Sequence, residues 1–282
     1  VFRSSDGGTS WNLAANADRV GDNHLHHLVG DPGDKNLLYA ANELRLYRTS
    51  DGGLKWKSLP LPSLARTRTV RISALAIVDA SGPGGADRSL LMGTDAGLWR
   101  SDDSGSSWKL VAITKADRFS RVLSVTAAGR RILIRTSNTI YLSEDSGASW
   151  KPFALLLPTS IIYDIALSPV VSDPILMATA RGLFASTDGG RTWAHRVQGI
   201  EDGTVSTVRY QTARAGQVWL VQFGKLYAST DAGVSWKIVR NVEIAESSIR
   251  ALWVEDSQPE RLFAITPDIG LFYMDLPHRK LN

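Results

Sequence analysis

A short motif recurs six times along the 282-residue chain. Each copy begins with Ser or Thr, followed by Asp two residues later, Gly four residues later and Trp seven residues later. The copies span residues 4–11, 49–56, 101–108, 143–150, 186–193 and 229–236, and successive Trp residues are 42 to 52 positions apart. Self-similarity with a period in this range indicates a propeller or another array of similar units.

The residue types of the motif predict a β-hairpin whose turn is locked by side chains. Apolar alternation precedes the copies, as in Leu183-Phe184-Ala185, and is typical of a strand. An Asp side chain accepts hydrogen bonds from backbone N–H groups of such a turn, and Gly supplies a positive φ. We therefore expect a structural role, not a catalytic one, for Asp6, Asp51, Asp103, Asp145, Asp188 and Asp231. The six motif tryptophans, and also Trp99, Trp219 and Trp253, are expected in the core.

Two further strands fit between consecutive motifs. In one repeat they are residues 162–167 and 175–179, with a Pro-containing turn between them. Each repeat then has four antiparallel strands, A to D, with the motif in the C–D turn, and this is the pattern of a propeller blade. Helical periodicity is absent over any useful length, so we expect an all-β fold.

The chain ends decide the expected number of blades. The C-terminal part supplies strands at 249–254, 262–266 and 270–276 without a further motif, whereas the N-terminal part supplies only the C and D strands around the first motif. A six-bladed propeller would then have a surplus C strand. The sequence therefore predicts a single seven-bladed domain over residues 1–282, with its missing N-terminal strands upstream of Val1.

The motif resembles the Asp-box, or BNR, repeat of β-propeller proteins. The families that carry this repeat include sialidases, xyloglucanase-type glycosidases, sortilin-like receptors and the photosystem II stability/assembly factor family. The resemblance covers almost the whole chain and implies the propeller fold. It does not imply one activity, because these families share the repeat and differ in what they do.

Composition narrows the classes of function. The absence of cysteine excludes disulfides, thiolate metal sites and cysteine nucleophiles. A net charge of +4 without a dense cationic stripe does not favour a nucleic-acid partner. No apolar run is long enough to cross a bilayer, so we expect no transmembrane segment in this chain, although peripheral association with a membrane complex stays open.

Arginines gather in the loops that the blade pattern places at the D–A and B–C connections. Guanidinium groups bind carboxylates and phosphates through two parallel hydrogen bonds, so such loops favour an acidic or polar protein partner. The expected binding residues are Arg66, Arg68, Arg71, Arg118, Arg121 and Arg181. The alternative is that these charges are only solvated loop residues.

Three histidines lie close together at the start of an expected strand. Alternation puts His24 and His26 on one side, where a metal ion is conceivable. No carboxylate stands at a recognisable spacing from them. We therefore expect neither a metal site nor a cofactor.

Two functions fit these features. The resemblance to sialidases implies converging arginines with a tyrosine–glutamate pair, and glycosidases in general need two carboxylates, whereas only Asp164 stands out in an expected A strand. We therefore expect a non-catalytic protein-binding or scaffold module outside the cytoplasm, as an accessory or assembly subunit of a larger membrane-associated complex. The alternative is an extracytoplasmic glycoside hydrolase of sialidase or xyloglucanase type.

Overall fold

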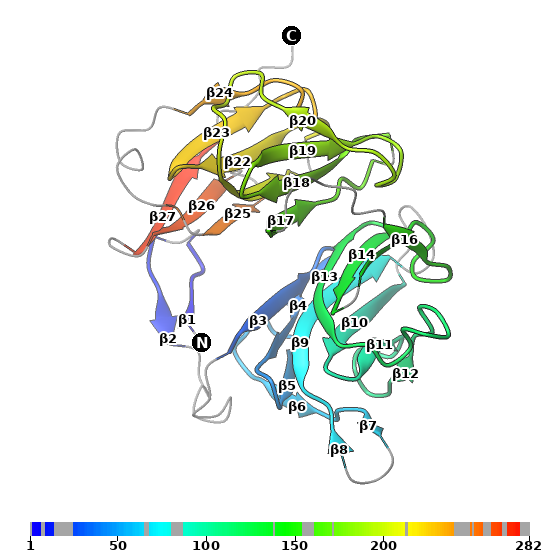
Figure 1. Ribbon diagram of the computed structural model, residues 1–282. Coiled ribbons are helices and arrows are strands. Elements are labelled where there is room, and N and C mark those ends of the chain that lie inside the picture. The colour runs from blue at the N-terminus through cyan, green and yellow to red at the C-terminus, as the bar shows by residue number, and fades with distance from the viewer. Residues whose placement is uncertain are drawn as a thin grey trace. The chain divides into compact units, whose positions relative to one another are not determined.

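The structure is a computed structural model (Figure 1). It describes residues 2–6, 9–13, 25–64, 68–79, 87–137, 139–153, 161–170, 172–211, 214–239, 249, 251–255, 261–266 and 270–276. The secondary structure of these residues consists of strands and turns, as the sequence predicts. No stretch of the described chain forms an apolar helix of the length that a bilayer requires.

The chain divides into two units, Val1–Pro152 and Phe153–Asn282. Each is described by itself, and the expectation of one domain over residues 1–282 stays a prediction. Both units are built from antiparallel sheets in which consecutive strands pair with each other. This meander is the arrangement of a propeller blade.

Three sheets begin in the first unit. Sheet 1 contains β3 (His27–Asp31), β4 (Asp34–Ala41), β5 (Leu46–Thr49) and β6 (Lys57–Leu59). Sheet 2 contains β9 (Ile72–Asp79), β10 (Arg88–Thr94), β11 (Gly97–Ser101) and β12 (Lys109–Leu110). Sheet 3 contains β13 (Val122–Ala128), β14 (Arg131–Thr136), β15 (Ile140–Ser143) and β16 (Lys151–Phe153). Two small hairpins add β1 (Phe2–Arg3) with β2 (Asn12–Leu13), and β7 (Ser63–Leu64) with β8 (Arg68–Thr69).

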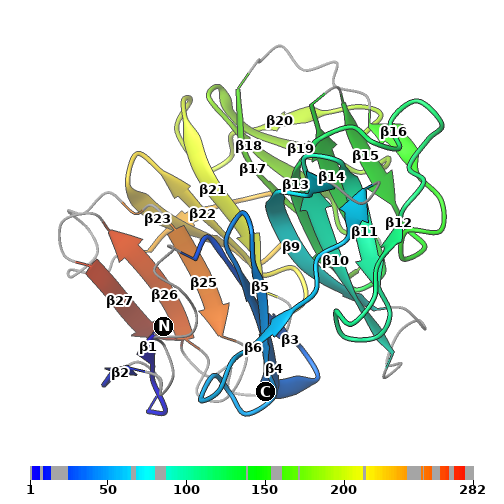
Figure 2. The same ribbon diagram turned by 90° about the horizontal axis from the view of Figure 1, so that it is seen from below.

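The second unit holds the other three sheets. Sheet 4 contains β17 (Ile162–Ala166), β18 (Ile175–Thr179), β19 (Gly182–Ser186) and β20 (Ala194–Arg196). Sheet 5 contains β21 (Val205–Tyr210), β22 (Val218–Gln222), β23 (Lys225–Ser229) and β24 (Lys237–Ile238). Sheet 6 contains β25 (Ala251–Glu255), β26 (Arg261–Thr266) and β27 (Gly270–Asp275). Within this unit the first strands of neighbouring sheets lie side by side, β17 next to β21 (Figure 2).

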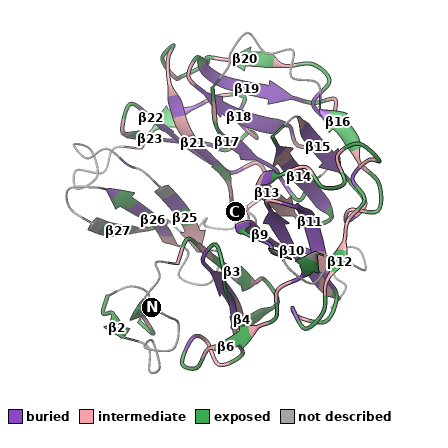
Figure 3. Ribbon diagram, turned by 60° about the horizontal axis from the view of Figure 1, so that its bottom comes forward, coloured by how far each residue is buried: buried purple, intermediate pink, exposed green. Residues whose placement is uncertain are grey.

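The cores lie between the faces of neighbouring sheets within a unit. Along β10, Leu90 and Met92 pack into the cluster shared with sheet 1, whereas Leu91 packs into the cluster shared with sheet 3. Because successive side chains of a strand point to opposite faces, a strand covered on both faces must be apolar at nearly every position. Second strands such as β14, β18 and β22 are accordingly buried at nearly every position, as Figure 3 shows for β14 and β18.

The number of blades differs from the predicted seven. The described residues form six blades, five of four strands and one of three, and the seven-bladed prediction is wrong. The extra blade was inferred by assigning the surplus C strand around the first motif to a blade of its own. That segment, β1 with β2, pairs only with itself among the described strands, and its two-residue strands leave Phe2 and Leu13 exposed.

The six motif turns, which we call the aspartate turns, share one hydrogen-bond pattern. The Ser or Thr hydroxyl donates to the Asp carboxylate two residues on, at 2.6 to 2.8 Å. The same carboxylate accepts the backbone N–H four residues further on, at 2.8 to 2.9 Å. In five turns the hydroxyl also accepts the N–H of the motif Gly, at 2.7 to 3.0 Å. These glycines have φ between 86° and 92°, the region that only Gly adopts freely.

The tryptophans differ in burial more than the motif predicts. Of the six motif tryptophans only Trp236 is buried, four are half-buried, and Trp11 is exposed. Trp99 and Trp219 are buried, which confirms their predicted core positions. Trp253 is 62% exposed, so its predicted core position is wrong.

Candidate functional site

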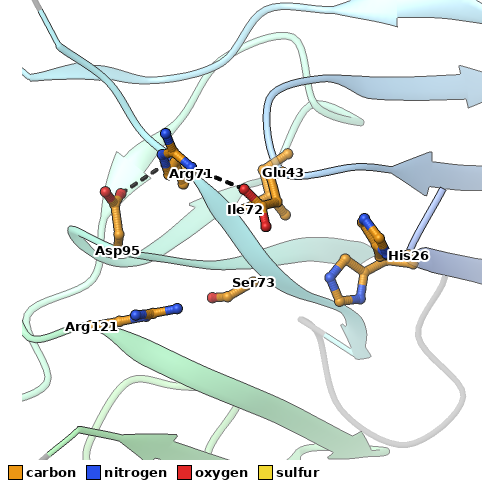
Figure 4. A pocket seen from close by; sticks show the side chains of 8 residues that line it. His26, Glu43, Arg71, Ile72, Ser73, Asp95 and Arg121 are labelled. Atoms are coloured by element: carbon orange, nitrogen blue, oxygen red, sulfur yellow. Dashed lines mark hydrogen bonds and ion pairs between the residues drawn. The ribbon is translucent and has the colours of Figure 1, made fainter. Parts of the chain in front are cut away.

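A pocket of about 400 Å³ opens in the first unit (Figure 4). It is lined by His26, His27, Glu43, Arg71, Ile72, Ser73, Asp95 and Arg121. All eight lie at the start of a first strand or in the turn between the second and third strands of a sheet. In these sheets the aspartate turns connect the third strand to the fourth, so the pocket is at the opposite end of the sheets from those turns.

Two turns and the segment before β9 supply the charged wall of the pocket. The Arg71 backbone N–H donates to the Asp95 carboxylate at 2.9 Å, and the Arg71 guanidinium pairs with Glu43 at 3.1 Å. Asn42 orients Glu43 indirectly, because its side-chain oxygen accepts the N–H groups of Leu44 and Arg45 and closes that turn. The Arg71–Glu43 pair is more than half exposed on both sides, so it contributes little to stability.

Arg121 and the two histidines also line the pocket. The Arg121 guanidinium and both imidazoles have no hydrogen-bond or ion-pair partner among the described residues, whereas Ser73 donates its hydroxyl proton to the Val122 carbonyl oxygen. Burial and the neighbouring His26 lower the pKa of His27 below its usual value. Among the described residues, the pocket therefore contains one guanidinium paired with a carboxylate, one guanidinium without a partner, and two imidazole rings.

The structure brings together only part of the predicted arginine set. Arg71 and Arg121 line the pocket. Arg118 is exposed, with its guanidinium 5.3 Å from the centre of the Phe119 ring. Arg181 is exposed in the second unit. Arg66 lies outside the described residues, and of Arg68 only the backbone, in β8, is described.

Asp164, the carboxylate considered for the glycosidase alternative, lies in the second unit and is engaged by its surroundings. It accepts the backbone N–H of Ile165 at 3.0 Å and of Val208 at 3.1 Å, and it pairs with the Arg209 guanidinium. Burial raises the pKa of Asp164, and the charge of Arg209 opposes that effect. The carboxylate thus joins β17 to β21.

The sequence did not single out the pocket itself. His26 and His27 were weighed there only as metal ligands, and His24 lies outside the described residues. Among the described residues no group of three His, Asp or Glu side chains is placed to hold a metal ion. The signal available in sequence was that Glu43 and Asp95 occupy equivalent turns of consecutive repeats.

Comparisons with known proteins agree on the fold. A family model described as Sortilin-Vps10, sortilin or neurotensin receptor 3, matches residues 96–218. No curated protein matches the sequence. The solved GH74 xyloglucanase from Xanthomonas campestris superposes with a TM-score of 0.70 at 18% identity over 97% of this chain. YCF48 from Cyanidioschyzon merolae gives a TM-score of 0.50 at 17% identity, with 88% of this chain and 94% of that chain covered. BBS1N, solved in complex with ARL6DN, gives 0.60 at 14% identity, with 87% of this chain and 76% of that chain covered.

These likenesses show a β-propeller fold and leave the activity open. Identities below 20% show the fold alone. The chain spans only 41% and 48% of the length of the two GH74 structures that it matches. The fold is thus shared with enzymes and with proteins solved in protein complexes.

Proposed function

We propose that the chain is a non-catalytic propeller that binds an acidic or polar protein surface. It would do so through the end of its sheets opposite the aspartate turns, where the second and third strands are connected. The observation that carries this proposal is that Arg121 lines the pocket without a side-chain partner among the described residues, with Arg118 exposed three residues away. Guanidinium groups free of internal partners are suited to carboxylate or phosphate groups of a partner. Arg66, Arg68 and Arg71 are proposed as further contacts in the first unit, and Arg181 is proposed as a contact in the second unit.

The carboxylates of Glu43, Asp95 and Asp164 are already hydrogen-bonded or ion-paired, and this supports a binding function over hydrolysis. Glycoside hydrolysis needs one carboxyl group to hold or deliver a proton and a second one to act as nucleophile or base. Glu43 is paired with Arg71, Asp95 accepts the Arg71 N–H, and Asp164 is held by Arg209 and two backbone amides. Each of these three carboxylates is already engaged by an arginine side chain or by a backbone N–H group.

The aspartate turns are proposed to be Asp-box repeats with a purely structural role. Each carboxylate is surrounded by donors from its own turn, which leaves little capacity for a ligand. The six proposed structural residues are Asp6, Asp51, Asp103, Asp145, Asp188 and Asp231. In this interpretation the resemblance to Asp-box families describes architecture and does not transfer an active site.

The relatives are compatible with an accessory role. BBS1N was solved in a complex with another protein, and the sequence resembles the photosystem II stability/assembly factor family. We infer an accessory or assembly subunit of a membrane-associated complex, located outside the cytoplasm.

Charge reversal at the two ends of the sheets tests the proposal. The double variant R118E/R121E is expected to lose capture of the partner in crosslinking followed by mass spectrometry, with an unchanged melting temperature. The matched control K55E/K109E reverses two exposed lysines at the aspartate-turn end and should capture the partner as the native chain does. Equal loss in both variants, or loss in neither, contradicts the proposal.

The alternative is a glycoside hydrolase, favoured by one observation. Glu43 and Asp95 line the same pocket as Arg71 and Arg121, so two carboxylates stand beside arginines. Hydrolysis of xyloglucan or sialosides that is abolished by both E43Q and D95N, in variants that remain folded, would establish this alternative. Absence of turnover on both substrate classes supports the binding function.

A further inference from the structure

Several nitrogen donors of the pocket side chains are not matched by acceptors among the described residues. The Arg71 charge is compensated by Glu43, and Asp95 is occupied by the Arg71 backbone N–H. The Arg121 guanidinium and the imidazoles of His26 and His27 have no hydrogen-bond or ion-pair partner in the described part of the chain, and these residues line one cavity with Ser73. Figure 4 shows Arg121 and His26 on different sides of this cavity.

The charged groups around the histidines come from three sheets. Glu43 approaches from the β4–β5 turn, Arg71 and Asp95 from the same end of sheet 2, and Arg121 from the segment before β13. With neutral imidazoles the two arginines and two carboxylates of the lining cancel. Protonation of the His27 ring leaves the described lining with a net positive charge, which a bound anion would compensate.

We propose that this pocket is a proton-coupled oxyanion site, in which a carboxylate, phosphate or sulfate group bridges the Arg121 guanidinium and the imidazoles of His26 and His27. The natural ligand would be an acidic group of the protein partner, and in this respect the inference rests on the proposed function. The chemistry of the site does not depend on that partner. A free anion of the medium is therefore a valid probe.

The coupling has a defined direction. Because His27 has a lowered pKa in the free protein, its imidazole is largely neutral near pH 7. A bound anion favours the charged ring, so binding takes up protons and tightens as pH falls below about 6.5. In the free protein the sign for stability is the reverse. The unfolded chain binds the proton more readily, so the free energy of unfolding decreases as pH falls through this range, and a bound anion restores it.

Calorimetric titration with sulfate tests the site, because sulfate keeps its charge between pH 5.5 and 7.5. At constant ionic strength in chloride, one coupled proton is expected to tighten sulfate binding by about tenfold from pH 7.5 to 5.5. R121Q should weaken binding by about tenfold or more at both pH values, since a guanidinium–oxyanion contact is lost. The double variant H26Q/H27Q should lose the increase in sulfate affinity between pH 7.5 and pH 5.5.

The matched control is R45Q, which removes an exposed arginine from the same turn as Glu43 without changing the pocket lining. It should bind sulfate as the native chain does. Absence of saturable sulfate binding at pH 5.5, binding that R121Q leaves unchanged, or equal affinity at both pH values overturns the inference. If sulfate binds as expected but R118E/R121E does not change partner capture, the proposed function is overturned and the oxyanion site is retained.

Discussion

The two ends of the same sheets are closed by turns of different character. At one end the six aspartate turns repeat a single hydrogen-bond pattern. At the other end the turns between second and third strands vary. Thr94 and Thr179 donate to a carbonyl three residues on, Asn42 caps its turn with a side-chain oxygen, and β22 and β23 are joined by Phe223 and Gly224 alone.

The aspartate turns stabilise every blade in the same way, whereas the turns between second and third strands differ from blade to blade. A turn closed by its own side chains fixes the hairpin and leaves few groups for other molecules. The varied turns place Glu43 and Asp95 beside Arg71, and Arg121 lines the same pocket without a side-chain partner among the described residues. Recognition is therefore expected at the varied end, and loss of stability is expected from changes at the uniform end.

The largest effect is expected for the motif tryptophans, and it should differ between copies. Trp236 is 4% exposed and packs with Leu176 and Leu220, so Trp236→Ala should cost about 3–5 kcal/mol of unfolding free energy. Trp11 is 46% exposed, and Trp11→Ala should change stability by less than about 0.5 kcal/mol. Urea unfolding of both variants measures the contrast, and equal losses would refute it.

A smaller loss is expected from the hydroxyl of an aspartate turn. Ser101 donates to Asp103 at 2.7 Å and accepts the Gly105 N–H at 2.7 Å, and its side chain is buried. Ser101→Ala leaves a buried N–H without a partner and should cost about 1–3 kcal/mol in urea unfolding. Ser106 is exposed in the same turn, so Ser106→Ala serves as the control with no expected change. Equal effects would mean that the lock does not stabilise the turn.

The positions of the strands could be predicted from the sequence because each strand has its own local alternation of apolar residues. The predicted strand at 175–179 coincides with β18, and the predicted strand at 270–276 is one residue longer than β27. The blade count failed because a hairpin motif alone does not show whether a sheet surrounds it, as at Asn12–Leu13. Trp11 and Trp253 failed for the same reason, since burial depends on which face a neighbouring sheet covers.

The pocket was harder to predict from the sequence, because it is formed by residues that are far apart along the chain. Arg71 meets Glu43 across 28 positions and Asp95 across 24. Loop composition indicated where arginine was dense, and it did not indicate which guanidinium would be compensated. That distinction between Arg71 and Arg121 requires the positions of the turns. Whether the predicted arginines bind a partner stays a prediction.

The stabilisation that the ionised aspartates give to their turns should be lost at acid pH. Hydrogen bonds from the Ser107 hydroxyl and N–H, and from Ser101, lower the pKa of Asp103 to about 2. Since this pKa lies below the value of 3.8 for an unperturbed aspartate, the stabilisation is complete above about pH 4 and is lost as pH falls towards 2. Urea midpoints of the native chain and Asp103→Asn should therefore converge between pH 4 and 2. A constant gap would show that ionisation is not involved.

The smallest effect has the opposite sign and lies at the varied end. Phe223 is 54% exposed and has a φ of 50°, a left-handed conformation that costs a non-Gly residue about 1–2 kcal/mol. Asn tolerates this conformation in a two-residue hairpin turn, so Phe223→Asn should raise the unfolding free energy by about 0.5 kcal/mol once the lost ring contact over Gly203 is subtracted. A gain in the urea midpoint would mean that this turn carries an aromatic ring at the expense of stability, as expected of a recognition surface. A loss greater than about 0.5 kcal/mol would mean that the Phe223–Gly203 contact holds the loop in place, and the varied turns would then be architecture as well.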